Sequence, residues 1–600
     1  MDRLFHDSLR GKTFKNLMEL ISTEENIMLA YRNLKGNKGS MTAGADGRDI
    51  TYLQKWETKS LVRHIQKKLK YYQPKKVRRV EIPKANGSKR QLGIPNIVDR
   101  LIQQAILQIL EPICEAKFHE RNNGFRPNRS TENAVAQCYK IMQVQKLHYV
   151  VDIDIQGFFD NIDHGKAIKQ FWTLGIRDKR LLKILSVMMK AEIAGIGFPE
   201  KGAPQGAILS PLISIVVLNE LDWWIASQWE CMKTRHPYAV MVNINGSENK
   251  GAKFLALKKT RLKECFIVRY ADDFKVFCRT KSACERLYHA IVQWLKERLG
   301  LEISKEKSRV VNLRKDYSEF LGFRMKVEKK QKREVVSSYM SQKSKKRAIK
   351  KLKDQIKNIQ KPKDQKDEYY QVNIYNSMVM GMHNYYQIAT NANLDFQEIA
   401  FLVNRSLNYR LRSRVKKKPE KEQKGYVYQR YRSSNQIRYI SDRPVAPIGY
   451  IRHKNPMFNA RKVNKYTPEG RRLIHKKLET VNMKTLHYLM RNPIINRSIE
   501  YNDNRLALYC ANQGKCYVTG KPLTPERIVC HHINPLSKKG TDAYQNLVIM
   551  DKDVHELIHA IKGNTVREYV ARVQPDYYAR DKINRYRARL NLEPIESFLR

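Results

Sequence analysis

The stretch Val268–Phe274 constrains this chain most, because it places two adjacent carboxylates inside an apolar, alternating pattern. Apolar residues precede and follow Asp272 and Asp273, and the flanks alternate as half-buried strands do. We therefore expect a β-hairpin with Ala271–Asp273 near its tip. Such a tip can bind a divalent metal through hard oxygen ligands, or it can be a solvated turn, and these residues alone leave both open.

A second stretch, Val150–Asp160, favours the metal site. It is typical of a strand with aspartates at alternate positions, so Asp152 and Asp154 would lie on one face. A strand that carries Asp154 beside a hairpin that carries Asp272 would gather three carboxylates from distant parts of the chain. Such a cluster can hold two Mg²⁺ ions for in-line phosphoryl transfer. We expect Asp152 to take a less direct part.

These motifs, in this order, resemble those of a reverse transcriptase of the kind encoded by group II introns. The resemblance rests on Tyr270–Asp273 and on Asp154–His164, and it extends over most of the chain. It implies a right-hand polymerase with α+β fingers and palm and a helical thumb. It also implies catalytic carboxylates that bind two Mg²⁺ ions with the help of one backbone carbonyl. These metal ligands would be Asp154, Ile155 through its carbonyl, Asp272 and Asp273.

Length and charge agree with a multidomain protein that binds nucleic acid. A chain of 600 residues is too long for one core, and 42% of its residues are hydrophobic. The formal net charge is +55. This excess would destabilise a compact chain by self-repulsion unless a polyanion offsets it, and nucleic acid is the obvious polyanion. Composition alone leaves a merely basic soluble protein as the alternative.

No stretch predicts a membrane span or a secretory signal. The most apolar segment, Ala207–Trp224, is interrupted by polar residues and is typical of a buried helix. The amino terminus has no apolar signal core. The nine cysteines show no paired spacing, which suits a reducing compartment. We expect a bacterial cytoplasmic, nucleoid-associated protein rather than an organellar one, with no membrane partner.

Residues 77–95 predict a basic β-hairpin, because Asn86-Gly87 separates two alternating segments. The resemblance implies that Lys84 and Arg90 on this hairpin reach the incoming triphosphate, as a point charge and a bidentate fork. A solvated basic edge strand is the alternative.

The resemblance assigns three further residues to the nucleotide pocket. Phe159 would clash with a ribose 2′-hydroxyl, so that deoxynucleotides are preferred, and a core phenylalanine is the alternative reading of this residue. Gln205, in the loop Gly202–Pro211, would line the pocket. Lys307 would lie near the active site.

The composition turns strongly basic after residue 330. Ile349, Leu352, Ile356 and Ile359 form an apolar stripe among lysines, which predicts an amphipathic helix. The resemblance makes this region a thumb, or maturase, domain that binds intron RNA. Further on, tyrosines alternate with cations, which suits nucleic acid, with a partly disordered linker as the alternative. These tyrosines are Tyr426, Tyr428, Tyr431 and Tyr439.

Motifs near the carboxyl end resemble an HNH (ββα-metal) nuclease. His555 and His559 are four residues apart, on one helix face, as two ligands of one ion would be, and His531 would be the third. The resemblance makes His532 the general base that takes a proton from water, and Asn546 the residue that orients it. The site would hold one divalent metal, Mg²⁺ or Zn²⁺.

Many such nucleases also hold a structural zinc between two cysteine pairs. Here only Cys516 stands at a matching position, and Thr519, Met550 and Asp553 stand where its partners would be. We predict no separate structural zinc in this domain.

The motifs predict six regions: an N-terminal extension (1–45), reverse transcriptase fingers and palm (46–330), a thumb and maturase domain (331–415), a basic DNA-binding region (416–495), an HNH endonuclease (496–570) and a basic helical tail (571–600). The insertion at residues 225–264 has no assigned role.

The resemblance implies a group II intron-encoded RNA-directed DNA polymerase with maturase and HNH activities, which supports intron mobility by target-primed reverse transcription. Its partners would be intron RNA, target DNA and dNTPs, and its oligomeric state (monomer or dimer) stays open. A splicing-only RNA-binding maturase and a defence or retron-type reverse transcriptase are the alternatives.

Overall fold

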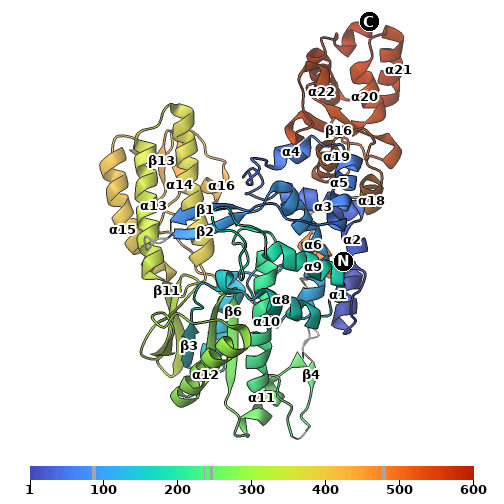
Figure 1. Ribbon diagram of the computed structural model, residues 1–600. Coiled ribbons are helices and arrows are strands. Elements are labelled where there is room, and N and C mark those ends of the chain that lie inside the picture. The colour runs from blue at the N-terminus through green and yellow to red at the C-terminus, as the bar shows by residue number, and fades with distance from the viewer. Residues whose placement is uncertain (84–88, 236, 243–247, 461–462, 476–480, 600) are drawn as a thin grey trace. The chain divides into compact units, whose positions relative to one another are not determined.

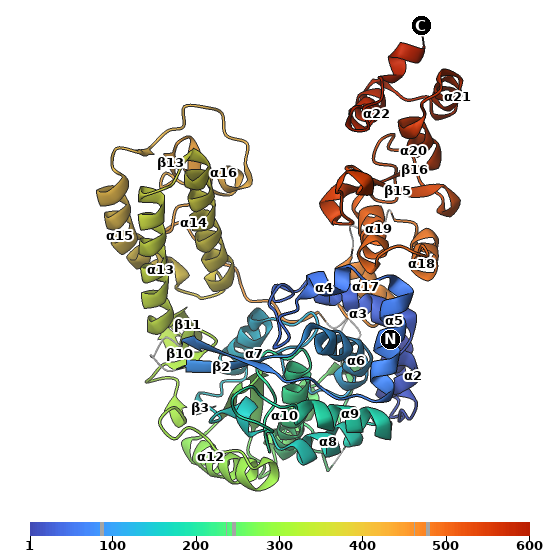
Figure 2. The ribbon, with the colours of Figure 1, turned by 45° about the horizontal axis from the view of Figure 1, so that its top comes forward.

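The computed structural model of the protein describes residues 1–83, 89–235, 237–242, 248–460, 463–475 and 481–599. The chain is mixed α/β and divides into two compact units (Figures 1 and 2). Each unit is assembled from segments that are distant in sequence. The first unit contains residues 1–118, 159–217 and 461–600, and the second contains residues 119–158 and 218–460.

The first unit begins with helices and one hairpin: α1 (Asp2–Leu9), α2 (Leu17–Ile21), α3 (Glu24–Lys35), α4 (Ile50–Gln54), α5 (Thr58–Lys70), β1 (Arg78–Pro83), β2 (Lys89–Ile94) and α6 (Ile97–Glu115). Its middle segment holds α8 (His164–Thr173) and α9 (Lys179–Met189), and the short η1 (Phe158–Asn161) begins at the boundary. Its last segment holds α17 (Pro468–Ile474), α18 (Met483–Arg491), α19 (Ile499–Ala511), β15 (Ile528–His532), β16 (Leu547–Asp551), α20 (Lys552–His559), α21 (Gly563–Val573) and α22 (Tyr577–Arg589). Short 3₁₀ turns complete it: η4 (Pro525–Arg527), η5 (Leu536–Lys538), η6 (Tyr544–Asn546) and η7 (Ile595–Phe598).

Helix α6 is the centre of the N-terminal part of the first unit. Most of its residues are buried, and it packs against α1 to α5. Side-chain hydrogen bonds fix these contacts. Ser8 Oγ donates to the Ile113 carbonyl (2.8 Å), and Asn26 Nδ2 donates to the Ala105 carbonyl (3.0 Å). The predicted basic hairpin is present as β1 and β2, with Arg78 opposite Ile94, whereas Lys84 and the Asn86-Gly87 turn lie outside the described residues.

The second unit contains α7 (Thr131–Gln143), β3 (Tyr149–Ile153), β4 (Met241–Val242), β5 (Glu248–Asn249), α11 (Gly251–Lys258), β6 (Cys265–Tyr270), β7 (Asp273–Cys278), α12 (Lys281–Trp294), the π-helical turn η2 (Leu295–Leu299), β8 (Arg309–Asn312), β9 (Ser318–Phe320), β10 (Phe323–Lys330) and β11 (Arg333–Met340). It continues with α13 (Gln342–Gln360), α14 (Gln365–Tyr386), α15 (Ala392–Leu411), β12 (Val415–Lys416), α16 (Tyr426–Tyr431), β13 (Arg438–Ile440) and β14 (Arg443–Val445). The apolar helix α10 (Ser210–Gln228) begins in the first unit and ends in the second.

A four-stranded antiparallel sheet in the order β6-β7-β3-β8 forms the core of the second unit. Helices α7 and α12 pack against it. Strands β6 and β7 are almost entirely buried, because alternate residues face the helices on one side and further apolar side chains on the other. The sheet therefore gives β3 and the β6–β7 hairpin a fixed register.

Helices α13, α14 and α15 pack together as a bundle in the second unit (Figures 1 and 2). The predicted amphipathic helix is α13. Leu352, Ile356 and Ile359 are buried, and Ile349 is half-buried. Lys345 is also buried, where it pairs with Asp395 of α15 (2.7 Å).

The predicted nucleic-acid role of the interleaved tyrosines needs correction for two of them. Tyr431 and Tyr439 are buried, and the Tyr431 hydroxyl lies 2.8 Å from Nδ1 of His383 on α14. The Tyr431 ring, on α16, meets the His383 ring edge to face, and Tyr439 lies on β13, because aromatic side chains are also good core residues. Only Tyr426 is fully exposed.

The segment after residue 527 folds as two antiparallel strands followed by a helix. Strand β15 pairs with β16, His531 lies opposite Val548, and α20 follows directly. Helices α21 and α22 pack on α20, and α19 packs on α3, α4 and α5. Among the described residues, no helix is long and apolar enough to cross a membrane.

Candidate active sites

The β-hairpin predicted around Asp272 is present. In the pairing of β6 with β7, Tyr270 lies opposite Asp273. Ala271 and Asp272 therefore form the turn, and Ala271 takes a left-handed backbone with φ +59°. This conformation is typical of tight hairpin turns and costs energy for a residue with a Cβ. The turn presents the two carboxylates side by side at the end of the hairpin.

The segment Arg121–Gly124 supports this turn. The Asn123 amide donates to the Arg269 carbonyl (2.8 Å), and the Arg269 amide donates to the Arg121 carbonyl (3.0 Å). A Cβ on Gly124 would lie 2.0 Å from the nitrogen of Ala271. No side chain fits at that distance, so glycine lets the segment pack directly on the turn.

A buried ion pair anchors the same turn from within. The side chains of Arg269 and Asp222, the latter on α10, are 0% exposed. Arg269 Nε and Nη2 donate to the two Asp222 oxygens at 2.7 and 2.5 Å, and Nη1 donates to the Ala271 carbonyl (2.8 Å). A bidentate pair of this kind fixes both direction and distance. Sequence reasoning missed it, and the available signal was the presence of Glu220 and Asp222 in a very apolar helix.

Asp154 directly follows β3, and Lys307 contacts it. Lys307 Nζ lies 2.9 Å from Asp154 Oδ2. The backbone of Asp154 is held by Ser304, whose amide donates to its carbonyl (2.8 Å), and by Ser308, whose hydroxyl accepts from its amide (3.2 Å). The side chains of Asp154 and Lys307, both predicted site residues, are therefore in contact. The Asp154 carboxylate is half-exposed and accessible to a ligand. Ile155, the neighbouring predicted ligand, has a buried side chain.

Negative charge accumulates around Asp273. Burial raises the pKa of its carboxyl group to about 6, and the charges of Asp152, Asp272 and Asp154 add to the rise while Lys275 opposes it. Like charges at short range disfavour ionisation. A cation bound beside Asp273 would stabilise its ionised form.

The donor set fits hard divalent cations, which prefer carboxylate and carbonyl oxygens. The charge accumulation around Asp273 is the observation that supports this fit. Among the described residues, however, the oxygens of Asp154, Asp272 and Asp273 do not all lie within 4.8 Å of one another. The three carboxylates lie in the same part of the second unit, but their oxygens do not converge as the ligands of one bound ion would.

Asp152, for which we expect a less direct part, has structural partners. It lies opposite Lys275 in the pairing of β3 with β7. Lys275 Nζ is 2.5 Å from Asp152 Oδ1, and the Ser318 hydroxyl is 2.9 Å from both carboxylate oxygens. Lys275 is buried. The Lys275 charge also opposes the rise in the pKa of Asp273. Sequence reasoning missed this pair because the partners are 123 residues apart.

The predicted nucleotide-pocket loop lies in the first unit and packs between two other segments. The Ala203 amide donates to the Phe159 carbonyl (2.8 Å), and the Gly93 amide donates to the Gln205 carbonyl (2.7 Å). A Cβ on Gly206 would lie 2.8 Å from the Gly93 oxygen. The loop that carries Gln205 is thus tied both to Phe159 and to strand β2.

Arg90 is exposed on β2, three residues before Gly93. Phe159 is half-buried, and Lys84 lies outside the described residues. Gln205 therefore lies on the loop Gly202–Pro211 of the first unit, and Arg90 and Phe159 belong to segments that are hydrogen-bonded to this loop.

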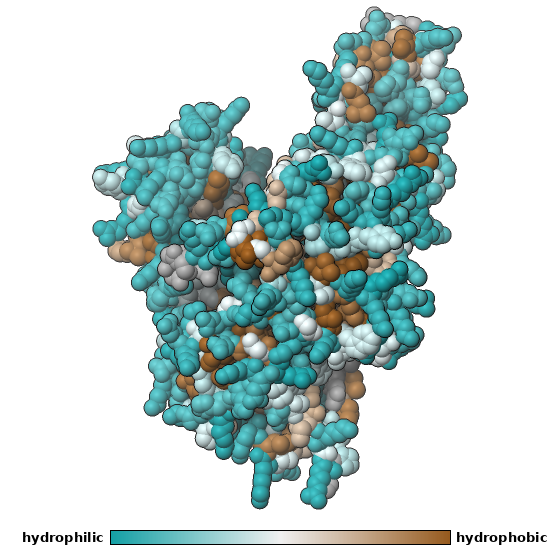
Figure 3. Space-filling model, viewed as in Figure 1, coloured by the Kyte–Doolittle hydropathy of each residue, from teal (hydrophilic) through white to brown (hydrophobic). Residues whose placement is uncertain are grey.

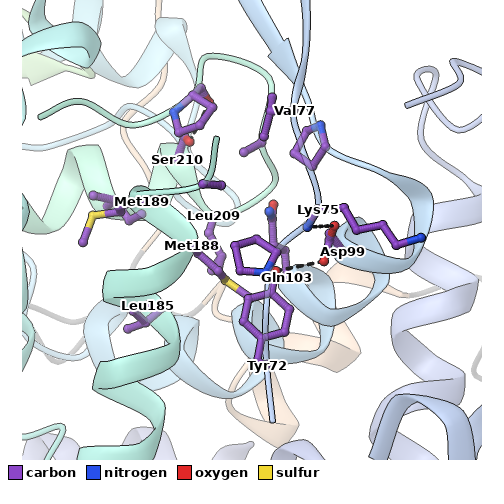
Figure 4. A pocket seen from close by; sticks show the side chains of 16 residues that line it. Tyr72, Lys75, Val77, Asp99, Gln103, Leu185, Met188, Met189, Leu209 and Ser210 are labelled. Atoms are coloured by element: carbon purple, nitrogen blue, oxygen red, sulfur yellow. Dashed lines mark hydrogen bonds between the residues drawn. The ribbon is translucent and has the colours of Figure 1, made fainter. Parts of the chain in front are cut away.

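A small cavity lies behind this loop (Figure 4). Its interior measures about 20 Å³, room for about one water molecule. The Tyr72 hydroxyl and the Lys75 amide donate to the Asp99 carboxylate (3.0 and 3.2 Å), and burial raises the pKa of Asp99. Gln103 accepts from the amide of Ile208 (2.9 Å). The cavity is a packing junction that supports the loop and has no room for a substrate.

The three predicted histidine ligands converge in the last segment of the first unit. Each offers a ring nitrogen within 4.8 Å of the others, and His559 Nε2 lies 3.3 Å from His531 Nδ1. Burial, with the neighbouring imidazoles, lowers the pKa of His531 to about 3 and that of His555 to about 4. The rings are therefore neutral at pH 7 and offer lone pairs. Three imidazoles suit a divalent transition metal such as Zn²⁺ and leave further coordination positions open.

The predicted orientation of His532 by Asn546 needs correction. His532 Nε2 lies 2.8 Å from Asp542 Oδ1. The Asn546 amide group instead accepts from the Asn534 amide (2.8 Å) and donates to the carbonyls of Asn534 (3.0 Å) and Thr541 (2.8 Å). Asn546 closes the loop between β15 and β16, because its side chain satisfies backbone groups that the strands leave unpaired.

Asp542 is a site residue that sequence reasoning missed. Burial opposes ionisation of its carboxyl group, but hydrogen bonds from His532 and Ser498 outweigh burial and lower its pKa. Asp542 is therefore a carboxylate at neutral pH, able to hold the His532 ring in one tautomer. The available signal was an aspartate four residues before Asn546, in the loop between two paired strands.

Cys516 and Asp553, two residues at the positions of a structural zinc site, have other partners. The Cys516 sulfur accepts from the Asp551 amide (3.4 Å). Arg527 lies 2.7 Å from Asp551 and 2.6 Å from Asp553. An ion pair thus joins the strand β16 to the segment before β15.

Comparison with known proteins identifies the family of the polymerase part. A family profile described as "Reverse transcriptase (RNA-dependent DNA polymerase)" matches residues 82–325, which include Asp154, Asp272 and Asp273. Protein YkfC of Escherichia coli (strain K12) is 31% identical over 324 residues, which cover 52% of this chain and 83% of that protein. The chain belongs to the reverse transcriptase family.

Two further relatives of this reverse transcriptase are named for introns. The group II intron-encoded protein LtrA of Lactococcus lactis subsp. cremoris is 29% identical over 448 residues, 64% of this chain and 72% of LtrA. The putative COX1/OXI3 intron 2 protein of Saccharomyces cerevisiae is 30% identical over 356 residues, 53% of this chain and 40% of that protein. The chain matches less than half the length of the yeast relative.

Beyond residue 325, the reverse transcriptase carries a basic groove of about 500 Å³ between α13 and α15. Its lining residues are Lys346, Ile349, Lys350, Lys353, Asp354, Lys357, Ser406 and Arg410. On α15, Phe401 and Tyr409 are exposed, the latter to 88%. Cations bind phosphates and exposed rings stack on bases, so this surface suits RNA. The face drawn in Figure 3 is largely hydrophilic, as the net charge requires.

Proposed function

We propose that this reverse transcriptase is a group II intron-encoded protein that copies RNA into DNA, assists the splicing of its intron RNA and cuts DNA with an HNH domain. The observation that carries the polymerase activity is the turn Ala271–Asp273, anchored by buried contacts in the same sheet as β3, which leads into Asp154. Support for the intron origin comes from the relatives named as group II intron-encoded and COX1 intron proteins.

For polymerisation, Asp154, Asp272 and Asp273, with the Ile155 carbonyl, would hold two Mg²⁺ ions. When bound, these ions activate the primer hydroxyl and neutralise the pyrophosphate that leaves. The primer 3′-oxygen attacks the α-phosphorus of a dNTP, so that one P–O bond forms and the bond to pyrophosphate breaks. The anchored turn would hold the Asp272 and Asp273 carboxylates in a fixed position and orientation while these bonds form and break.

The nucleotide would be held by residues that the chain brings from several segments. Arg90 and Lys84 would contact the triphosphate, and Lys307 would add positive charge beside Asp154. Gln205 would line the base and sugar pocket. Phe159 would exclude the ribose 2′-hydroxyl, which makes the enzyme select dNTPs.

For DNA cleavage, His531, His555 and His559 would hold one divalent ion, Mg²⁺ or Zn²⁺, which when bound polarises the scissile phosphate. His532 would accept a proton from the attacking water as the new P–O bond forms and the bond to the 3′-oxygen breaks. The product carries a free 3′-hydroxyl. Asn546 would keep the loop in shape around this reaction.

These activities combine into target-primed reverse transcription. The intron RNA would bind the basic thumb surface and insert into one DNA strand, the HNH domain would cut the other strand, and the new 3′-hydroxyl would prime synthesis. The protein would then work in the bacterial cytoplasm on the nucleoid, with intron RNA, target DNA and dNTPs as partners.

The first test is primer extension on an RNA template with dNTPs and Mg²⁺. Wild type should extend the primer, and Asp272→Ala should lose extension while it retains RNA binding, because it removes a metal ligand and leaves the thumb intact. Asp316→Ala, which removes an exposed aspartate, is the matched control and should extend normally.

Absence of extension by wild type, with RNA binding retained, would contradict the polymerase and favour a splicing-only maturase. The intron part has a separate test. RNA transcribed from the sequence that flanks the reading frame should splice faster with the protein than without it, and equal rates would contradict maturase activity.

A further inference from the structure

Helix α19 contacts two different parts of the first unit. It precedes the nuclease strands, yet it packs against α3, α4 and α5 of the N-terminal segment (Figures 1 and 2). Backbone contacts fix its start, because the Ile499 amide donates to the Trp56 carbonyl (3.0 Å). The side chains of α19 therefore face N-terminal helices on one side and the nuclease loop on the other.

A buried polar cluster joins α3 to α19. Lys35 Nζ lies 2.7 Å from Glu500 Oε1 and 2.7 Å from Asn504 Oδ1. The Tyr31 hydroxyl donates to Glu500 Oε2 (2.5 Å), and Arg32 Nε lies 3.2 Å from Asp503 Oδ1. Glu500, Asp503 and Asn504 are all buried. Their oxygens depend on the cations of α3, since an unpaired buried carboxylate is costly.

The opposite face of α19 holds the loop that contains Asp542. Asn504 Nδ2 donates to the Asp542 carbonyl (2.7 Å), and the Ser498 hydroxyl donates to the Asp542 carboxylate. Asp542 in turn accepts from His532 Nε2 (2.8 Å). The Tyr501 ring stacks on the His532 ring, with centroids 5.5 Å apart and planes at 21°.

Asn504 is the connecting residue of this network. Its oxygen accepts from Lys35, and its nitrogen donates to Asp542 and to Glu500 (2.9 Å). Both ends of the amide group are therefore used, and rotation about its χ angles would break hydrogen bonds on both faces. Two hydrogen bonds separate the Lys35 ammonium from the backbone of Asp542.

We propose that the N-terminal helix α3 positions the nuclease base His532 through Lys35, Asn504 and Asp542. This inference rests on the nuclease function proposed above. Lys35, Asn504 and Asp542 are positioning residues. They hold the ring of His532 in one orientation and tautomer toward the attacking water, and they contact neither the metal ligands nor the DNA.

The test is the conversion of supercoiled DNA to nicked circles by the full-length protein. Loss of a residue that orients a catalytic group typically costs about 10- to 100-fold. We expect a fall of about 10- to 100-fold in the maximal nicking rate for Asp542→Ala and about tenfold for Asn504→Leu and Lys35→Met, with unchanged half-saturating DNA concentration. Asp542→Asn, which keeps an oxygen acceptor for His532, should recover part of the loss.

Controls separate positioning from folding. Lys59→Met removes an exposed lysine from α5, another helix that α19 contacts, and should nick as wild type does. The visible absorption of Co²⁺ bound at the three histidines, and primer extension, should be the same in Lys35→Met as in wild type.

Each outcome is decisive. Absence of nicking by wild type would overturn the nuclease function itself. Nicking by wild type with Lys35→Met equal to Lys59→Met would overturn the positioning role while the nuclease stands. Parallel loss of nicking, Co²⁺ binding and primer extension in Lys35→Met would mean that the contact only maintains the fold, and it would also overturn the proposal.

Discussion

We propose a divalent cation at the carboxylates around Asp273 and another at the three histidines, and these two sets of side chains differ in their electrostatics. Around Asp273, burial raises the pKa of the carboxyl group to about 6, the neighbouring aspartates add to the rise, and Lys307 contacts Asp154. At the three histidines, burial lowers the pKa of the imidazoles, which are therefore neutral at pH 7, and one nitrogen of each ring lies within 4.8 Å of those of the others. Neutral ligands can pack together without an ion, whereas charged ligands repel one another until a cation arrives.

This difference has a functional consequence. A preassembled site loses little order when it binds its ion, so we expect tight and lasting metal binding at the histidines. The carboxylates, in contrast, would need the ion to bring their oxygens together around one point. We therefore expect metal binding at the carboxylates to depend on the substrate more than metal binding at the histidines does.

The largest expected effect is the separation of the two activities by loss of one histidine. His559→Ala removes a ligand, and since loss of a residue that merely supports a ligand costs about 10- to 100-fold, nicking should fall by at least about 100-fold. Primer extension should remain. His487→Ala, an exposed histidine on α18, is the control and should keep both activities.

Metal analysis of the same proteins sharpens the comparison. Wild type should retain one tightly bound transition metal after dialysis, His559→Ala should retain none, and His487→Ala should retain one. More than one tightly bound zinc in wild type would contradict the prediction that no separate structural zinc exists beside Cys516.

The next effect concerns the buried pair beneath the polymerase turn. Arg269→Met leaves Asp222 buried and unpaired, which should cost about 3–5 kcal/mol in the unfolding free energy of the second unit, measured by urea denaturation. Primer extension should be lost, and nicking at low urea should persist. Equal loss of both activities would contradict the independence of the two sites.

A double variant separates stability from turn geometry. Arg269→Met with Asp222→Leu replaces the pair by apolar groups and should recover most of the stability. It does not restore the hydrogen bond to the Ala271 carbonyl. Primer extension should therefore stay below wild type, and full recovery would contradict a role for Arg269 in holding the turn.

The smallest effect is that of Lys307. Its contact with Asp154 is an exposed ion pair, for which about 0.2–1 kcal/mol is typical, or roughly 1.5- to 5-fold in competing cation affinity. In Lys307→Met the Mg²⁺ concentration for half-maximal primer extension should fall by that factor, while the KM for dNTPs rises. Lys305→Met is the matched exposed control, and the same shift in both variants would contradict a specific contact.

Local patterns in the sequence predicted the elements well. The alternation around Asp272 predicted the hairpin β6–β7, and the spacing of His555 and His559 predicted two neighbouring rings on one helix, whose centroids are 4.6 Å apart. In both cases the residues that decide the structure are neighbours in the chain, so periodicity carries the information. The basic hairpin of β1 and β2 and the amphipathic α13 were predictable for the same reason.

Contacts between distant segments were not predictable in this way. Asp222, Lys275 and Asp542 look like ordinary charged residues until the fold places Arg269, Asp152 and His532 beside them. Nor does composition tell a buried tyrosine from one that stacks on a base, so the role predicted for Tyr431 was wrong. Knowledge of the register between β3 and β7 would have placed Lys275 opposite Asp152.

The contact of Lys35 with Asn504 spans 469 residues of chain. At about 5–20 residues per second, a ribosome needs roughly 25 to 90 seconds to synthesise the partner after it has made α3. For that interval the polar face of α3 has no helix to cover it. The whole polymerase sheet is synthesised within the same interval. The contact between Lys35 and Asn504 can therefore form only after the polymerase sheet has been synthesised.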